Sequence, residues 1–450
     1  MKHKAVWSGP SIQIDPLFAY YTDRSADSIA EEIELAGYRT VHYFVVSENK
    51  VNRELIDAFH AKGIAVWALV IGNGTFSTDG YPAEWPGWQM ELLKPANDGF
   101  IRLSPFSGSY RTWKKAAVAA LLTDYPFDGI EFAEPFFPEW DGIRTGTYGD
   151  VGPLAQAAFE QRYQEEIPDF RNPGSPRYYL SDTKRYRNWV EFRVEAVNDF
   201  LDELLNGAGG ARDVRPDIAV ATWSLAIDDG PRSVERLREI QGLDAPAMIA
   251  KVKPDIHVLQ THWPDWTKSE SELPPDYIKA YRPFADAIRA AHPGMPIAVQ
   301  ADIGSAKHML KSREWLNGFS RAVKRYGYAA WTAYEYHLGK YMYDEKPVPL
   351  KVQRIGAREL VLSFNKRIDG ASVLMPGHVL LDTGGHVRPL FPEAGAKIDG
   401  NRIVVYAEQL PRTSFELVFA NVTDTPSRWL FNEHEPNAIM AGTHVVVPGR

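Results

Sequence analysis

The chain has 450 residues, which suits a large domain joined to a smaller one. A hydrophobic content of 44% and a charged content of 24% are typical of a soluble globular protein, and the net charge of −8 argues against a nucleic-acid binder, because phosphate contacts need a basic face. There is no cysteine, so disulfides, thiolate nucleophiles and cysteine-ligated metals are excluded. No apolar stretch reaches the ~18 residues of a transmembrane helix, and the N-terminus lacks the apolar run of a signal peptide. We expect a cytoplasmic protein with no membrane or nucleic-acid partner; the alternative is a secreted protein whose signal peptide has been removed.

Short apolar runs alternate with helical patterns from residue 4 to about residue 345. The runs are apolar on both faces, as buried parallel strands are. We predict eight strands, at residues 4–12, 40–47, 64–72, 127–132, 217–225, 255–261, 296–303 and 328–335. Between them, spacings such as Val51, Leu55 and Phe59, followed by Gly63, predict amphipathic helices that end at a glycine.

Eight strands alternating with helices predict a (β/α)8 TIM barrel over residues 1–346. The alternative is a doubly wound open sheet, which often carries a glycine-rich phosphate loop, and the sequence has no such motif. Two aromatic-rich insertions, residues 73–110 and 133–185, follow predicted strands and are expected at the active-site face.

The pattern changes after Pro347. Five short strands separated by turn residues predict a small β-sandwich over residues 347–425, with strands at 359–364, 378–383, 386–391, 402–407 and 414–421. Residues 426–450 have weak periodicity and are left as an unassigned tail.

The fourth predicted strand carries the clearest chemical signal, in FDGIEFAEPFFP. Glu131 and Glu134 lie three residues apart where a buried strand ends. A carboxylate in such a place is unfavourable unless it is paired or solvated in a cleft, so the pair predicts a site. Strand alternation directs Glu131 into the barrel, where it would bind substrate or tune Glu134, and places Glu134 at the lip.

This layout resembles a broad group of bacterial TIM-barrel glycoside hydrolases and hydrolase-like proteins over about residues 95–225. The shared features are the Tyr110-Arg111 helix start, the strand ending Asp-Gly-Ile-x-Phe-acid, and the segment 189–193 (WVEFR) before strand five. The resemblance implies glycoside chemistry at the barrel mouth. Ala133-Glu134-Pro135 is similar to the Asn-Glu-Pro signature of the largest retaining clan, with alanine in place of asparagine, which implies that Glu134 is the proton donor.

Glycosidic cleavage uses two carboxylates, one that protonates the leaving oxygen and one that attacks or activates water. Asp302 ends strand seven, where the retaining clan is known to keep its nucleophile, and Glu335 ends strand eight. Either residue could be the second catalytic carboxylate. We expect the two carboxylates to converge in one aromatic-walled cavity.

Aromatic and neutral polar residues near the predicted strands are candidates for sugar binding: Trp7, Tyr43, Trp140, Trp223, His262, Trp263 and Trp331. The sequence therefore predicts a glycoside hydrolase that takes a carbohydrate substrate and needs no cofactor or metal. One alternative is a metal-dependent barrel hydrolase with His42, His262, Asp302 and Glu335 as ligands, although the sequence has no His-Glu-x-x-His helix. The other is a non-catalytic barrel that binds carbohydrate.

Overall fold

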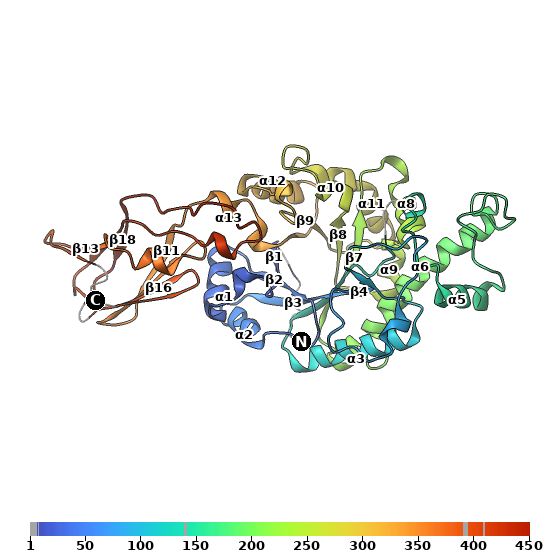
Figure 1. The fold of residues 1–450 in the computed structure, drawn as a ribbon, viewed down its shortest axis with the longest axis horizontal. Coiled ribbons are helices and arrows are strands. Elements are labelled where there is room, and N and C mark those ends of the chain that lie inside the picture. The colour runs from blue at the N-terminus through green and yellow to red at the C-terminus, as the bar shows by residue number, and fades with distance from the viewer. Residues whose placement is uncertain (1–6, 8, 139–141, 390–394, 408–409) are drawn as a thin grey trace.

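A computed structural model of the protein describes residues 7, 9–138, 142–389, 395–407 and 410–450. Eight parallel strands close into a barrel in the order β1-β10-β9-β8-β7-β6-β3-β2, which confirms the predicted TIM barrel (Figure 1). The strands are β1 (Gly9–Ile14), β2 (Thr40–Val45), β3 (Ala65–Ile71), β6 (Gly129–Ala133), β7 (Ala219–Ala226), β8 (Ile256–Thr261), β9 (Ile297–Asp302) and β10 (Ala330–Tyr334).

Alternation along each strand separates two cores. In β6, Ile130 and Phe132 join the large core under the helices, whereas Ala133 belongs to a second core inside the barrel. Gly129 also faces inward, and a Cβ atom there would lie 2.3 Å from the ring of Trp67. Gly129 therefore has a packing role, because only glycine leaves room for the indole.

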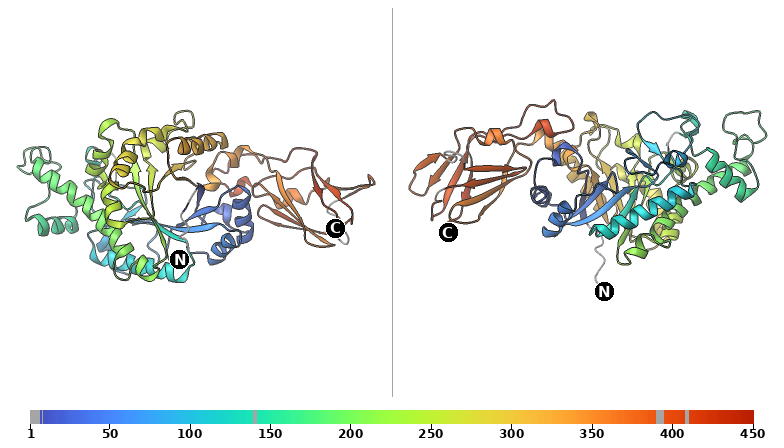
Figure 2. Two further views of the ribbon diagram at one scale, coloured as in Figure 1. Left: turned by 180° about the vertical axis from the view of Figure 1, so that it is seen from behind. Right: turned by 60° about the horizontal axis from the view of Figure 1, so that its bottom comes forward.

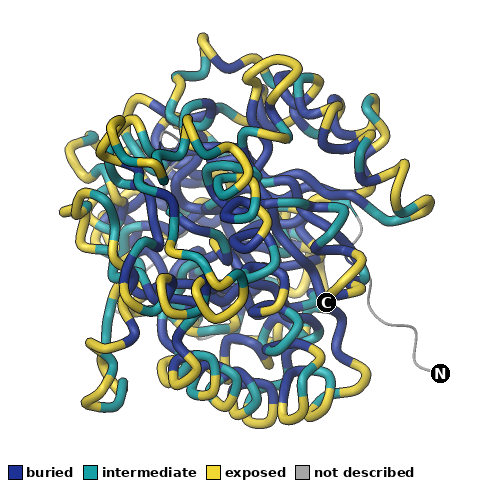
Figure 3. The backbone as a smooth tube through the Cα atoms, turned by 90° about the vertical axis from the view of Figure 1, so that its right-hand side faces the viewer, coloured by how far each residue is buried: buried dark blue, intermediate teal, exposed yellow. Residues whose placement is uncertain are grey.

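Helices surround the strands, and the burial pattern in Figure 3 runs from buried strands at the centre to exposed outer helix faces. The main helices are α1 (Ala26–Leu35), α2 (Arg53–Ala61), α3 (Gly108–Asp124), α6 (Thr183–Asn206), α8 (Ser233–Gln241), α9 (Ala245–Val252), α11 (Arg282–Ala291) and α12 (Arg313–Arg325). Short helices are α4 (Gly142–Thr145), α7 (Ala211–Val214), α10 (Trp263–Trp266), α13 (Tyr341–Asp344) and α14 (Gly370–Val373). Within the described part of the chain, no helix combines the length and apolar character that crossing a membrane requires.

Two four-stranded antiparallel sheets follow the barrel. One sheet has the order β11-β12-β16-β15 and the other β14-β13-β17-β18. Their facing side chains share one core, so they form a β-sandwich. The strands are β11 (Pro349–Arg354), β12 (Glu359–Phe364), β13 (Val379–Asp382), β14 (Val387–Pro389), β15 (Ala396–Asp399), β16 (Arg402–Tyr406), β17 (Phe415–Phe419) and β18 (Thr443–Val447). The last segment, unassigned from the sequence, supplies β18, which pairs with β17 along its whole length.

Helix α1 of the barrel lies against the sandwich (Figures 1 and 2). Glu31 of α1 is fully buried and accepts hydrogen bonds from Lys351 at 2.8 Å, from Ser363 at 3.1 Å and from Arg402. Burial acts to raise the pKa of Glu31, but the hydrogen bonds from Lys351 and Arg402 outweigh it and hold the pKa at about 2. The contact between barrel and sandwich therefore includes a buried cluster of charged groups around Glu31.

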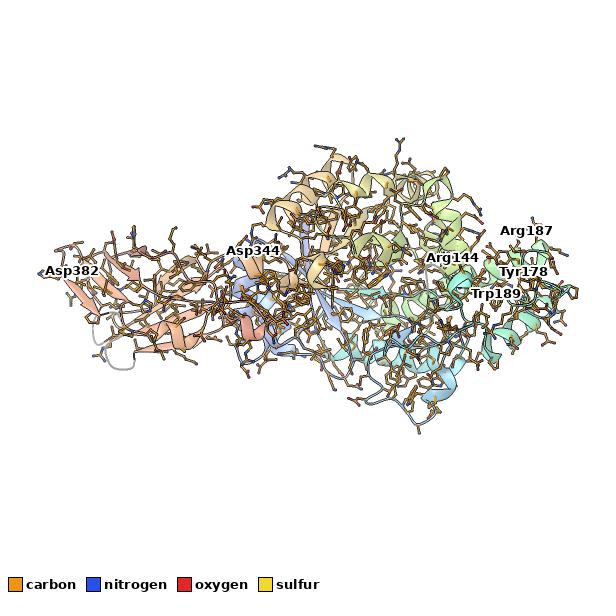
Figure 4. The ribbon with its side chains drawn as sticks, turned by 45° about the horizontal axis from the view of Figure 1, so that its top comes forward. Arg144, Tyr178, Arg187, Trp189, Asp344 and Asp382 are labelled. Atoms are coloured by element: carbon orange, nitrogen blue, oxygen red, sulfur yellow. The ribbon has the colours of Figure 1, made fainter. Side chains whose placement is uncertain are left out.

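The second insertion, which contains α5 (Pro153–Tyr163), packs with the first half of α6 to form a projection on the side of the barrel opposite the sandwich (Figure 1). Figure 4 places Tyr178, Arg187 and Trp189 at this end of the molecule and Asp382 of the sandwich at the other. Arg193 joins the projection to the barrel, since its buried guanidinium donates to the backbone oxygens of Gly149 and Ile240, each at 2.6 Å. The molecule is thus elongated, with the barrel in the middle.

Candidate active site

A cavity of about 510 Å³ opens where four neighbouring strands, β3, β6, β7 and β8, end. This volume is within the range of about 300–1,000 Å³ that small-molecule sites occupy. The described residues that line it come from strand ends, from both insertions and from α8 and α10: Asn73, Phe76, Met90, Asp98, Phe100, Arg102, Glu134, Phe136, Pro138, Leu225, Gln241, Gln260, His262, Trp263 and Trp266. The cavity therefore occupies the face on which TIM-barrel enzymes carry their active sites.

Aromatic pairs form two parts of the cavity wall. Phe76 and Phe100, on the hairpin of β4 (Gly74–Thr75) and β5 (Ile101–Arg102), have ring centroids 4.9 Å apart. Trp263 and Trp266 of α10 lie 4.3 Å apart at 90°. Phe76 is 59% exposed and Trp263 is 41% exposed, so their faces remain open to a ligand in a protein that buries most of its aromatic side chains.

Glu134 projects into this cavity from a strained turn. Its φ is +52°, in the left-handed region that residues other than glycine rarely adopt, and the residue is exposed. The chain after β3 holds the turn in place through Asn73. Its backbone nitrogen donates to the backbone oxygen of Glu134 at 3.4 Å, and its Nδ2 donates to the backbone oxygen of Pro135 at 2.6 Å. Backbone strain of this kind concentrates at functional sites.

Three further titratable side chains among the described residues line the cavity wall, namely Arg102, Asp98 and His262. Arg102 donates to both carboxylate oxygens of Asp98, at 3.1 and 2.7 Å, and this interaction lowers the pKa of Asp98. Burial, with a smaller contribution from the Arg236 cation, lowers the pKa of His262 to about 3. His262 is therefore a neutral imidazole at neutral pH.

Glu131 lies in the barrel interior rather than at the cavity. It is fully buried, accepts from Trp223 Nε1 at 2.9 Å and is hydrogen-bonded to Nδ1 of His42. His42 Nε2 is 2.7 Å from the hydroxyl of Ser11, which itself donates to the Trp331 oxygen at 3.1 Å. The order of these groups is that of a nucleophile, base and acid, but all are buried, so the cluster satisfies an internal carboxylate and is closed to substrate.

Asp302 ends β9 and is almost fully buried. Its Oδ1 accepts from the backbone nitrogens of Gly304 at 2.9 Å and Ser305 at 3.0 Å, and its Oδ2 accepts from the Ser305 hydroxyl. Burial raises the pKa of Asp302, although these hydrogen bonds act in the opposite direction. Its backbone is paired with Tyr334 of the neighbouring strand β10.

Glu335 follows β10 and is fully buried. One oxygen accepts from the Tyr21 hydroxyl at 2.5 Å and from the Asp15 nitrogen at 3.2 Å. The other accepts from the His337 nitrogen at 2.9 Å and contacts the His337 ring. Both oxygens are thus occupied, and Glu335 fixes the chain around the mouth.

The phenol of Tyr334 lies close enough to several carboxylates for their charges to act on it. Burial raises the pKa of its phenol well above the ordinary value, and the charges of Glu335, Asp15, Asp302 and Glu134 act in the same direction. Asp15, directly after β1, is partly exposed, and burial raises its pKa to about 6. The mouth of the barrel therefore gathers carboxyl groups from the ends of β1, β6, β9 and β10.

Comparison with known proteins gives structural likeness only. No model of a known protein family matches the chain, and no curated protein matches it in sequence. Among solved structures, it is similar to a beta-galactosidase from Rahnella sp. R3, with 14% identity and a TM-score of 0.43 over 66% of this chain and 45% of that chain. A catalytic mutant of a GH42 beta-galactosidase from G. stearothermophilus gives 15% identity and a TM-score of 0.47 over 73% and 51% of the two chains. The glycoside hydrolase domain of PelA from Pseudomonas aeruginosa gives 10% identity and a TM-score of 0.39 over 73% of this chain and 95% of that chain.

The chain thus spans about half the length of the two galactosidases. The assignment of the fold rests on the strand pairing described above.

The residues predicted to bind sugar fall into two groups, those that line the cavity and those that are buried in a core. His262 and Trp263 line the cavity. Trp7 and Trp223 lie in the core inside the barrel, and Tyr43 and Trp331 lie in the core between strands and helices, so these four do not line the cavity. Trp140 lies outside the described residues. Strand alternation explains Tyr43 and Trp331, because both occupy positions that face outward.

The four metal ligands considered from the sequence are not brought together. Across the residues that the structure describes, no three histidine or acidic side chains are grouped as metal ligands would be. His42 is held inside the barrel by Glu131 and Ser11, and Glu335 by Tyr21 and His337.

Asp15 and the hairpin aromatics were missed from the sequence. Asp15 carries the same signal as Asp302, a carboxylate after a buried strand, but the first strand was predicted to end at Ile12 and it ends at Ile14. Phe76 and Phe100 lie in an insertion expected at the active-site face, but nothing in their spacing distinguishes them from packing residues.

Proposed function

We propose that the protein is a glycoside hydrolase that cleaves an oligosaccharide or glycoside by carboxylate acid/base chemistry at the mouth of its barrel. One observation carries the proposal: an exposed carboxylate, Glu134, projects from a strained strand-end turn into an aromatic-walled cavity of about 510 Å³. Aromatic faces suit the apolar faces of sugar rings, and the amides of Asn73, Gln241 and Gln260 suit their hydroxyl groups.

Glu134 has the role of proton donor and acceptor to the glycosidic oxygen. Its left-handed turn directs the side chain into the cavity, and the Asn73 contacts keep the turn fixed while substrate binds. Glu131 has a positioning role, because it is sealed in the barrel by His42 and Trp223 directly beneath this strand end.

The second carboxylate has two candidates beside Tyr334. Asp302 retains the role proposed from the sequence, since its strand end faces the mouth, although its oxygens already accept three hydrogen bonds. Asp15 competes with it, because it is partly exposed and has a pKa of about 6. Glu335 is assigned to positioning, as both its oxygens are occupied. The candidate whose Asn variant loses as much turnover as a Glu134 variant is the second carboxylate.

The test is Glu134→Gln, which keeps the shape of the side chain and removes its ability to exchange a proton. Turnover of a mixed oligosaccharide library, followed by mass spectrometry, is expected to fall by about 10²–10⁴-fold. Sugar binding and the melting temperature should be retained. Glu314→Gln, an exposed change on α12, is the matched control and should leave turnover unchanged.

Normal turnover by the Glu134 variant would remove the assignment of this residue. Binding of sugar without turnover by the unmodified protein would instead establish the non-catalytic carbohydrate-binding barrel.

A further inference from the structure

The charge inventory of the cavity wall is unbalanced. Among the described lining residues, there are two carboxylates, Asp98 and Glu134, one guanidinium, Arg102, and no ammonium group. His262 adds no positive charge at neutral pH, because burial lowers its pKa to about 3. An anion entering this cavity would therefore meet a net negative wall.

Arg102 is already committed to a partner inside the protein. Its two Nη atoms donate to the two oxygens of Asp98, and Nη1 also donates to the Phe100 oxygen at 3.2 Å. Its side chain is only 13% exposed, whereas that of Asp98 is 46% exposed. Asp98 therefore presents its carboxylate to the cavity while it covers the guanidinium that would otherwise recognise an acidic group.

The remaining polar groups of the wall are neutral. Asn73 and Gln241 are almost fully buried amides, and Gln260 is a partly exposed one. Within the described part of the chain, no donor reaches the side-chain oxygen of any of the three. Buried amide oxygens without a donor are costly, and the hydroxyl groups of a sugar are donors that can complete them after a small rotation of the amide.

We propose that the substrate is a neutral saccharide, and that the Arg102–Asp98 pair excludes sugars carrying a carboxylate or sulfate at this site. The inference rests on the proposed function and names its substrate class. A uronate in the cavity would be desolvated beside Asp98 and Glu134, and the one cation among the described lining residues, Arg102, is already bound by Asp98. A neutral sugar meets no such penalty, and its rings contact Phe76, Phe100 and Trp263.

The experiment compares neutral and acidic tetrasaccharides of the same linkage in the gluco, manno and galacto series. Binding to the full chain is measured by isothermal titration calorimetry or saturation-transfer NMR. In the series that binds, the neutral compound is expected to bind at least about tenfold more tightly than its uronate counterpart. Added salt should leave affinity for the neutral compound unchanged.

Asp98→Asn tests the mechanism of exclusion. The variant removes the carboxylate that both Nη atoms of Arg102 contact, while the bond from Nη1 to the Phe100 oxygen remains. The ratio of uronate affinity to affinity for the neutral compound should rise by about tenfold or more relative to the unmodified protein. Asp79→Asn is the matched control, because Asp79 lies in the same insertion, pairs with Lys50 at 3.1 Å and does not line the cavity.

Equal or tighter binding of the uronate by the unmodified protein would overturn the proposal and leave the proposed function standing. A failure of Asp98→Asn to gain uronate affinity would overturn the role of the pair. If no saccharide of either kind binds in any series, the proposed function itself fails, and the inference fails with it.

Discussion

The carboxylates at the strand ends differ in the hydrogen-bond donors that the neighbouring segments place around them. After β9 a tight turn presents the Gly304 and Ser305 nitrogens to Asp302, and after β10 the tyrosine and histidine around Glu335 occupy its oxygens. After β6 the chain turns left-handed and leaves Glu134 directed at the cavity. The sequence could mark each of these residues as unusual, because each acid ends an apolar strand. It could not rank them, because the ranking depends on turns and on partners distant in the chain.

Asp15 provides a test at this scale. Burial raises its folded-state pKa from 3.8 to about 6, so the folded protein binds a proton between these values that the unfolded chain releases. The free energy of unfolding should therefore fall as pH rises from about 4 to about 6 and remain lower above that range. Asp15→Asn cannot ionise, so its stability relative to the unmodified protein should grow over this window, by at most about 3 kcal/mol.

Urea denaturation at a series of pH values measures this difference. A difference that does not change between pH 4 and pH 7 would show that Asp15 is not desolvated as described.

At the scale of elements, periodicity alone located all eight barrel strands. The runs are short and apolar on both faces, and that pattern has few interpretations once helices alternate with them. The ends were less accurate, and the missing two residues of the first strand concealed Asp15. The edge strands β11, β15 and β18 of the sandwich were not predicted, because edge positions lack the alternation that a core imposes.

Helix α1 gives the second test. Glu31 has a folded-state pKa of about 2, below its ordinary 4.5, so it contributes stability that is present above about pH 4.5 and is lost as pH falls toward 2. Glu31→Gln removes the charge that Lys351 and Arg402 require. We expect the variant to be less stable at pH 7 by about 1–3 kcal/mol, with the difference shrinking between pH 4.5 and 2.

Thermal unfolding followed by circular dichroism at several pH values checks this expectation. Glu314→Gln, on the exposed face of α12, serves as the control. Equal stability of the Glu31 variant and the unmodified protein at pH 7 would mean that the ionic contact contributes nothing to folding.

For the whole molecule, the sequence predicted a barrel followed by a sandwich but not how they are joined. The joint depends on pairs such as Glu31 with Arg402, more than 300 residues apart in the chain, and one sequence carries no record of such pairing. The projection around α5 and α6 was expected at the active-site face with the rest of its insertion. Among its described residues, Glu134, Phe136 and Pro138 line the cavity, whereas Tyr148, Ala155, Phe159 and Phe170 belong to a separate core.

A chain of residues 1–346 tests the joint. Removing the sandwich leaves the buried carboxylate of Glu31 without Lys351, Ser363 or Arg402. We expect its melting temperature to be lower than that of the full chain by at least about 5 °C. Equal melting temperatures and equal turnover would show that the barrel is self-sufficient.

The close fit of Gly129 beneath Trp67 bears on how this barrel can diversify. A side chain added at residue 129 would displace the indole, and the indole packs in turn against Trp7 and His42. Substitutions in the core inside the barrel therefore destabilise the fold before any effect on ligand choice can be selected. The side chains of Phe76 and Trp263 are exposed, so substitutions there disturb less packing. New specificities can arise at these positions while the core inside the barrel stays the same.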